Sequence, residues 1–189
     1  MAKLRQQYAI GLSPLREALS RLVGEGLVVS EGQRGFRVAP FSPEDLDDLT
    51  FLWQIVSEGA FRAAMALHDE NWEGAVVSAF HVLERRCDRV GSGDPADRAA
   101  FEESQRAFHL TLTGGAGSSR AAYAIGVLYD QARRYRLLFY NDTVDVNLAL
   151  QSYRELMDHV LSGNIEAAVV GLRLRLTTWR DEVRRRAGW

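Results

Sequence analysis

The sequence is poor in cysteine and in long apolar runs, and each shortage excludes a class of protein. A single cysteine, Cys87, rules out an internal disulfide framework and a cysteine-based zinc cluster. No apolar run reaches the roughly 18 residues that a membrane span needs, and the opening MAKLRQQ lacks the apolar core of a signal peptide. We therefore expect a cytoplasmic protein that has no membrane partner.

The sequence also lacks a large net charge of either sign, but this near balance of basic and acidic residues hides their uneven distribution along the chain. The formal net charge of the 189 residues is −2, and 47% of them are hydrophobic, which is ordinary for a globular protein. Residues 1–42 carry six basic and three acidic side chains, whereas the remainder carries 17 basic and 22 acidic ones. A small basic part on a larger acidic one suggests that the first part meets a polyanion. The alternative is chance, because an excess of three charges over 42 residues is modest.

Residues 4–38 predict the end of one helix, a turn, a second helix and a β-hairpin. Ser13 and Pro14 mark the start of the second helix, with Ser as the N-cap and Pro at the first helical position. The glycines in 24–26 mark its end. Residues 27–30 and 36–38 are short apolar strands on either side of a glycine-bounded turn. The second helix would bury one stripe, formed by Leu15, Leu19, Leu22 and Val23.

From residue 42 onward the pattern predicts only helices. Short polar or glycine-rich breaks separate six of them, at about 42–68, 72–89, 96–113, 120–141, 147–161 and 165–186. Since the loops are short, neighbouring helices should pack antiparallel as a bundle. We therefore expect two domains, residues 1–41 and residues 42–189, in a mainly α protein.

A helix-turn-helix with a hairpin wing suits double-stranded DNA, because its second helix fits the major groove. Ser13 and Arg16 stand at the start of that helix, where they can reach base edges or phosphates. Gln33, Arg34 and Gly35 form the tip of the wing, which can follow the DNA backbone or enter the minor groove. The alternative for each arginine is a solvated surface charge, and for the glycine it is plain turn chemistry.

These residues also carry a family resemblance that covers essentially the whole chain. Residues 4–19 (LRQQYAIGLSPLREAL), with GLV at 26–28 and RGFRV at 34–38, closely resemble the winged-helix reader of GntR-family transcription regulators. The remainder resembles the FCD effector domain of that family, through Phe108-His109, the Arg134-Tyr135-Arg136 run and SGNIEAA at 162–168. The resemblance implies a partial winged helix-turn-helix followed by an all-α antiparallel bundle of the FCD type.

The chain departs from the family pattern at its start. Family members have a further helix before the point where this sequence begins, so we expect a shortened reader. Gly11 and Leu12 stand where the family often has Ser-Arg, so DNA contacts from those two side chains do not carry over.

Many FCD domains bind a divalent metal through an Asp and a His four residues apart and a His on each of the last two helices. The resemblance places Gln105, His109, Tyr153 and Arg175 at these four positions, so one ligand of the four remains. Gln, Tyr and Arg are poor ligands for such metals, and a guanidinium repels a cation. We therefore predict no family-type metal site and no cofactor. His159 would substitute for a ligand only in a different register.

The replaced residues predict a different chemistry for the same cavity. Arg175 can bind a carboxylate in bidentate fashion where relatives use a metal, and Gln105, His109 and Tyr153 can hydrogen-bond the rest of a small acid. Arg134 is a further pocket candidate of the family type. The alternative is that Arg175 pairs with a buried acid or points to solvent. The tryptophans within the helical region are expected to serve packing.

The functional hypothesis is a homodimeric repressor whose affinity for a DNA operator is controlled by a small organic acid. One rival is an enzyme that uses the cavity, although the sequence has no nucleophile elbow, phosphate loop or Cys/His dyad. A second rival is a ligand sensor or adaptor that does not bind DNA, which the missing first helix would suit.

Overall fold

A computed structural model describes residues 2–32, 35–90, 94–139 and 146–189 of the chain. The chain divides into two compact units, an N-terminal unit (Met1–Ser42) and a helical unit (Pro43–Trp189). The mainly helical fold with a small hairpin that the sequence predicts is confirmed. In the part of the chain described here, no helix is both long and apolar enough to cross a bilayer.

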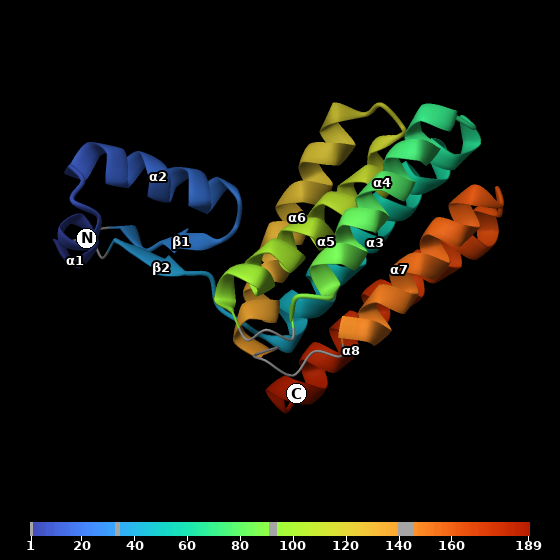
Figure 1. Ribbon diagram of the computed structural model, residues 1–189. Coiled ribbons are helices and arrows are strands. Elements are labelled where there is room, and N and C mark those ends of the chain that lie inside the picture. The colour runs from blue at the N-terminus through green and yellow to red at the C-terminus, as the bar shows by residue number, and fades with distance from the viewer. Residues whose placement is uncertain (1, 33–34, 91–93, 140–145) are drawn as a thin grey trace. The chain divides into compact units, whose positions relative to one another are not determined.

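The N-terminal unit contains two helices and a two-stranded sheet (Figure 1). Helices α1 (Ala2–Tyr8) and α2 (Leu12–Gly24) precede strands β1 (Val28–Ser30) and β2 (Phe36–Val38). The strands pair antiparallel, with Val28 opposite Val38. The small core of this unit consists of Leu15, Leu19 and Val28, covered in part by Leu4, Leu22, Val23 and Phe36.

The start of α2 corrects the sequence prediction, and its end agrees with it. The helix begins at Leu12 rather than after Ser13, and Gly11 in extended conformation is the N-cap. Pro14 is then the third helical residue, which costs nothing because the first four N–H groups of a helix have no intrahelical partner. At the other end Gly26 adopts φ 70°, so that its N–H and that of Leu27 bond back to the carbonyls of the last turn.

The described residues of the helical unit form six helices, which match the predicted segments to within about two residues. They are α3 (Pro43–Ala66), α4 (Glu70–Cys87), α5 (Pro95–Gly114), α6 (Ser119–Phe139), α7 (Val146–Leu161) and α8 (Ile165–Ala187). Over the described residues, side chains cap four of the N-termini, because Asp69, Asp94, Ser118 and Asn164 each accept a hydrogen bond from a backbone N–H of the first turn.

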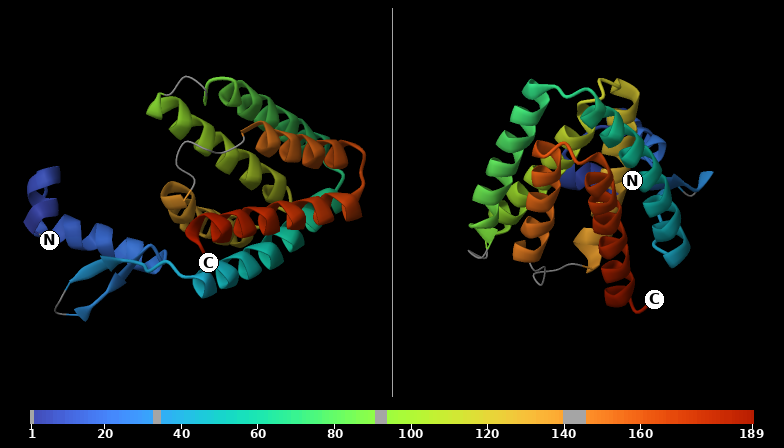
Figure 2. Two further views of the ribbon diagram at one scale, coloured as in Figure 1. Left: turned by 90° about the horizontal axis from the view of Figure 1, so that it is seen from below. Right: turned by 90° about the vertical axis from the view of Figure 1, so that its right-hand side faces the viewer.

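The helices pack around a common apolar core. Helix α3 lies beside α8, and α8 lies beside α7 (Figure 2). The core includes Phe61, Phe108, Tyr153, Leu156 and Leu172, which are almost completely buried. The turn after α5 needs Gly115, because a Cβ there would lie 2.6 Å from the Trp72 ring.

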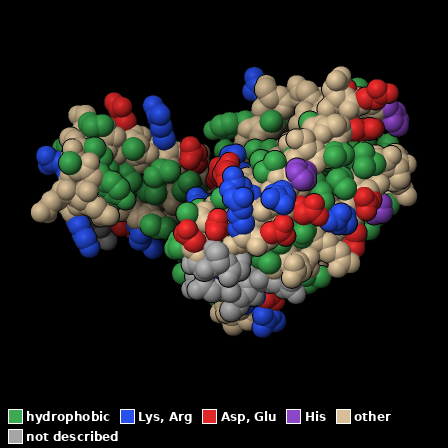
Figure 3. Space-filling view, in the orientation of Figure 1, with side chains coloured by type: hydrophobic (Ala, Val, Ile, Leu, Met, Phe, Trp, Pro, Cys, Tyr) green, Lys and Arg blue, Asp and Glu red, His purple; other side chains and the backbone are tan. Residues whose placement is uncertain are grey.

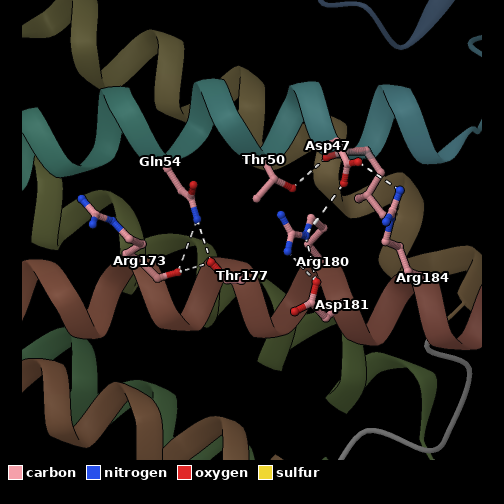
Figure 4. A network of polar contacts seen from close by, with 9 residues as sticks. Asp47, Thr50, Gln54, Arg173, Thr177, Arg180, Asp181 and Arg184 are labelled. Atoms are coloured by element: carbon pink, nitrogen blue, oxygen red, sulfur yellow. Dashed lines mark hydrogen bonds and ion pairs between the residues drawn. The ribbon is translucent and has the colours of Figure 1, made fainter.

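Polar contacts join the first turns of α3 to α8 and α6. Asp47 pairs with Arg184 at 3.0 Å and lies 3.8 Å from Arg180, both on α8 (Figure 4). Two residues earlier, Asp45 accepts a hydrogen bond from the Tyr135 hydroxyl of α6 at 2.5 Å. The start of α3 is therefore held from two directions, one turn after the N-terminal unit ends.

Candidate functional site

The start of α2 presents the residues that the sequence assigns to DNA contact. Ser13 and Arg16 are both exposed on the first turns of this helix. Within the described ranges Arg16 makes no ion pair, so its guanidinium is available to an outside partner. Figure 3 shows Lys and Arg side chains projecting at several points of the N-terminal unit.

Hydrogen bonds join the described residues on either side of the wing tip. Gly35 adopts φ 100°, a conformation that side chains rarely tolerate, and its carbonyl accepts a hydrogen bond from the Glu31 N–H at 2.8 Å. Gln33 and Arg34, the other two predicted tip residues, lie outside the described residues. Arg37 on β2 is exposed and pairs with Glu31 across the hairpin.

The helical unit contains a partly open cavity of about 650 Å³. Its walls come from α3, α5, α6, α7 and α8, together with Val90 after α4. Three of the predicted residues, Gln105, His109 and Arg175, line it. Polar side chains share the lining with apolar ones, which include Phe101, Leu137, Leu148, Leu174 and Trp179. A cavity of this volume suits a ligand the size of a metabolite.

Arg175 on α8 is positioned by hydrogen bonds to α7. Its Nη1 donates to Ser152 Oγ at 3.1 Å and its Nη2 donates to the hydroxyl of Tyr153. The guanidinium carbon lies 3.5 Å from the centroid of the Tyr153 ring. No carboxylate among the described residues pairs with Arg175. Tyr153 itself, predicted to bind the effector, is fully buried and is not among the residues that line the cavity; it contacts Arg175 instead.

His109 on α5 is a neutral imidazole with a fixed proton. The indole Nε1 of Trp53 donates to His109 Nε2 at 3.0 Å, and Ser57 Oγ lies 3.3 Å from the same nitrogen. Because an indole N–H can only donate, Nε2 carries the lone pair and the proton is on Nδ1. Burial lowers the pKa of His109 to about 3, and the charges of Arg175 and Arg136 contribute to this shift.

The Arg-Tyr-Arg run of α6 contributes a different arginine to the cavity from the predicted one. Arg134 is not among the lining residues; its Nη2 lies 3.5 Å from Asp45 and its Nε donates to the Gln131 carbonyl. Arg136 lines the cavity instead. Arg136 follows Ala132 by four residues, and positions four apart share a helix face, but it takes the structure to show that Ala132 is buried.

Comparisons with known proteins agree with this architecture. Residues 1–38 match the family described as bacterial regulatory proteins, gntR family, and residues 54–177 match the FCD domain. The chain belongs to the GntR family. Its helical unit is an FCD domain, and the family and the relatives named below are transcription regulators, not enzymes.

Relatives of this GntR-family chain include two curated regulators. The HTH-type transcriptional repressor GlaR of Escherichia coli K12 is 34% identical over 146 residues, which are 76% of this chain and 64% of GlaR. The regulator BphR of Paraburkholderia xenovorans LB400 is 30% identical over 182 residues, 96% of this chain and 74% of BphR. The chain thus spans just under two thirds of the length of GlaR.

Solved structures show the same fold. A putative GntR regulator from Rhodococcus sp. RHA1 matches with a TM-score of 0.77 at 20% identity. The match covers 97% of this chain and 84% of the Rhodococcus chain. McbR/YncC of E. coli has a TM-score of 0.75 at 17% identity, with 94% and 82% covered.

The residues at the family's metal positions do not fit a divalent cation in this GntR-family chain. The guanidinium of Arg175 stands at one of the four positions and is bonded to Tyr153 at another. The Nε2 lone pair of His109 is taken by Trp53. Over the described ranges, no three His, Cys, Asp or Glu side chains are grouped so that they could hold a metal ion. A fixed cation at the site disfavours a second one.

Proposed function

We propose that this chain is a DNA-binding transcription repressor whose operator affinity is controlled by a small organic acid, bound in the FCD cavity without a metal. The observation that carries the proposal is Arg175, a cation that faces the cavity and has no carboxylate partner among the residues described. Its contacts with Ser152 and Tyr153 hold it in one orientation before a ligand arrives.

The residues around Arg175 complete a site for an acid. Neutral His109 can donate a hydrogen bond from Nδ1, and the amide of Gln105 can donate or accept one. A carboxylate held by a guanidinium makes charge-assisted hydrogen bonds, which are stronger than neutral ones. An arginine thus takes over the anchoring that the family resemblance gives to a metal.

Control of DNA binding follows if the acid binds one arrangement of the protein better than another. The ligand then shifts the population, and the affinity for DNA changes with it. A homodimer would present two readers to a palindromic operator in the cytoplasm. GlaR is named a transcriptional repressor, which supports the proposal that DNA binding by this chain represses transcription.

The test measures binding of the acid and of DNA on the same full-length chain. Thermal unfolding with a panel of acids from acetate to octanoate should show stabilisation that EDTA does not remove. Arg175→Gln should abolish that stabilisation, whereas Arg173→Gln, a control on the outer side of α8 where Arg173 pairs with Glu58, should keep it. Stabilisation that disappears with EDTA would contradict metal-free binding.

DNA binding is measured by fluorescence anisotropy, with labelled DNA fragments from the promoter of the gene that encodes this chain. The acid should weaken binding, and Arg16→Ala should cost about 1–3 kcal/mol of binding free energy if Arg16 reads a base. Unchanged DNA binding by Arg16→Ala would count against the assignment of α2 as the reading helix.

A further inference from the structure

We infer that the ligand of the FCD cavity is an acid with a sizeable apolar body, and that Arg136 is a second anchor for its carboxylate beside Arg175. The inference rests on the proposed function and names the ligand class and a binding residue that neither the sequence nor the comparisons assign.

Arg136 has hydrogen-bonding capacity that the protein leaves unused. Its Nη2 donates to the Tyr129 carbonyl at 3.3 Å, and its guanidinium carbon lies 4.3 Å from the centroid of the Tyr129 ring. Its Nε is buried and has no hydrogen-bond partner in the part of the chain described. A buried donor without a partner is unfavourable, and a ligand oxygen in the cavity would satisfy it.

Arg136 and Arg175 act on the same small region. Both line the same cavity as His109, and both charges lower the pKa of that buried imidazole. Among the described residues neither arginine has a carboxylate partner. Two cations near one buried neutral group repel each other, and an anion bound between them would remove that cost. A head group with at least one full negative charge therefore fits this position.

The rest of the cavity indicates the other half of the ligand. Leu137, Leu148 and Leu174 line the cavity, yet 56%, 63% and 64% of their surfaces are exposed. A small, fully polar acid would leave these leucines against water. An alkyl chain or aromatic ring would cover them, and the volume of about 650 Å³ has room for it. The favoured class is therefore an amphipathic monocarboxylate.

The experiment is isothermal titration calorimetry on the full chain with four probes. Octanoate and 4-phenylbutanoate represent the inferred class, propionate is the small acid, and octanamide lacks the charge. We expect both large acids to bind at least tenfold more tightly than propionate or octanamide. Arg136→Gln should weaken octanoate binding about 10- to 100-fold, the usual loss for a hydrogen bond to a charged group.

Three further variants separate a loss of binding from a loss of folding. Arg120→Gln, at an exposed position near the start of the same helix, should bind octanoate as the parent does. Arg136→Lys keeps the positive charge but loses the paired N–H donors of the guanidinium. Its affinity for octanoate should lie between those of the parent and Arg136→Gln. Leu174→Gln should weaken octanoate binding and leave propionate binding unchanged.

The outcomes separate this inference from the function on which it rests. Full octanoate affinity in Arg136→Gln, with loss in Arg175→Gln, would overturn the second anchor and leave the proposed function standing. Equal binding of propionate and octanoate would overturn the apolar body. Unchanged octanoate binding by Leu174→Gln, together with a changed oligomeric state in sedimentation, would show that a second copy covers these leucines and would overturn their role in the ligand site. Binding of no acid at all, propionate included, would overturn the proposed function itself.

Discussion

The buried imidazole of His109 couples the stability of the FCD domain to pH. Burial, with help from Arg175 and Arg136, lowers its pKa from 6.5 to about 3 in the folded protein. Below pH 6.5 the unfolded chain therefore binds a proton that the folded chain does not. The free energy of unfolding should fall as the pH drops, by up to about 1.4 kcal/mol per pH unit.

Urea unfolding between pH 5 and 6.5 measures this slope in a window where carboxylates contribute little. Glu182, for example, has its pKa lowered to about 2 by hydrogen bonds from Arg185 and Arg186. Its contribution to stability is therefore lost only below pH 4.5, the ordinary pKa of a glutamate. His109→Gln should flatten the slope, whereas His81→Gln, at an exposed position, should not. A slope that survives in His109→Gln would assign the effect to another group.

Among single residues, the sequence predicted which ones line the cavity where a family pattern or a fixed spacing marked them. Gln105 and His109 lie four apart on α5, and the structure places both on the cavity. Arg136 was missed because two arginines separated by one residue face different directions, and the resemblance did not say which one points inward. Trp53 was expected to serve packing only. Its hydrogen bond to His109 joins α3 to α5, and sequence spacing does not reveal such a long-range contact.

Among the elements, α3 is the one that follows the N-terminal unit along the chain and also lines the cavity. It follows directly on Ser42, and its first turns hold α8 through Asp47 and α6 through Asp45. These two partner helices carry Arg175 and Arg136, respectively. A ligand that moves either helix would therefore act on the start of α3 through these contacts.

We predict that Asp47→Ala reduces the effect of octanoate on DNA affinity while octanoate binding itself stays unchanged. The Asp47–Arg184 pair is 44% and 38% exposed, so its loss should cost less than about 1 kcal/mol of stability. Anisotropy titrations with and without octanoate give the response, and Asp48→Ala at the next position along α3 is the control. A full response in Asp47→Ala would show that the contact is structural only.

The helices themselves were predictable because their ends carry strong local signals. Prolines, glycines and Asp or Asn caps separate the segments of the helical unit, and the observed bounds follow them closely. The start of α2 was misplaced because a proline anywhere in the first turn leaves the hydrogen bonding intact, so Ser13-Pro14 did not fix the first residue.

For the whole molecule, charge and periodicity are enough to separate a basic reader from an acidic helical bundle. The chain divides at Ser42, close to the position where the composition changes. The apolar stripe of α2 and the helical periodicity of the remainder are local features, so they can be read from one sequence. The cavity is not local, because five helices supply its walls, and its shape depends on how they pack.

The proposed coupling between the two units makes a prediction about the complete protein. If octanoate weakens binding to a DNA fragment by some factor, the same fragment must weaken octanoate binding by that factor, because linkage is reciprocal. We expect a factor of about 5 to 150, the usual range for allosteric coupling. Anisotropy at saturating octanoate measures one direction and calorimetry on the DNA-bound chain measures the other. A factor of one in both would show that the cavity does not control the reader.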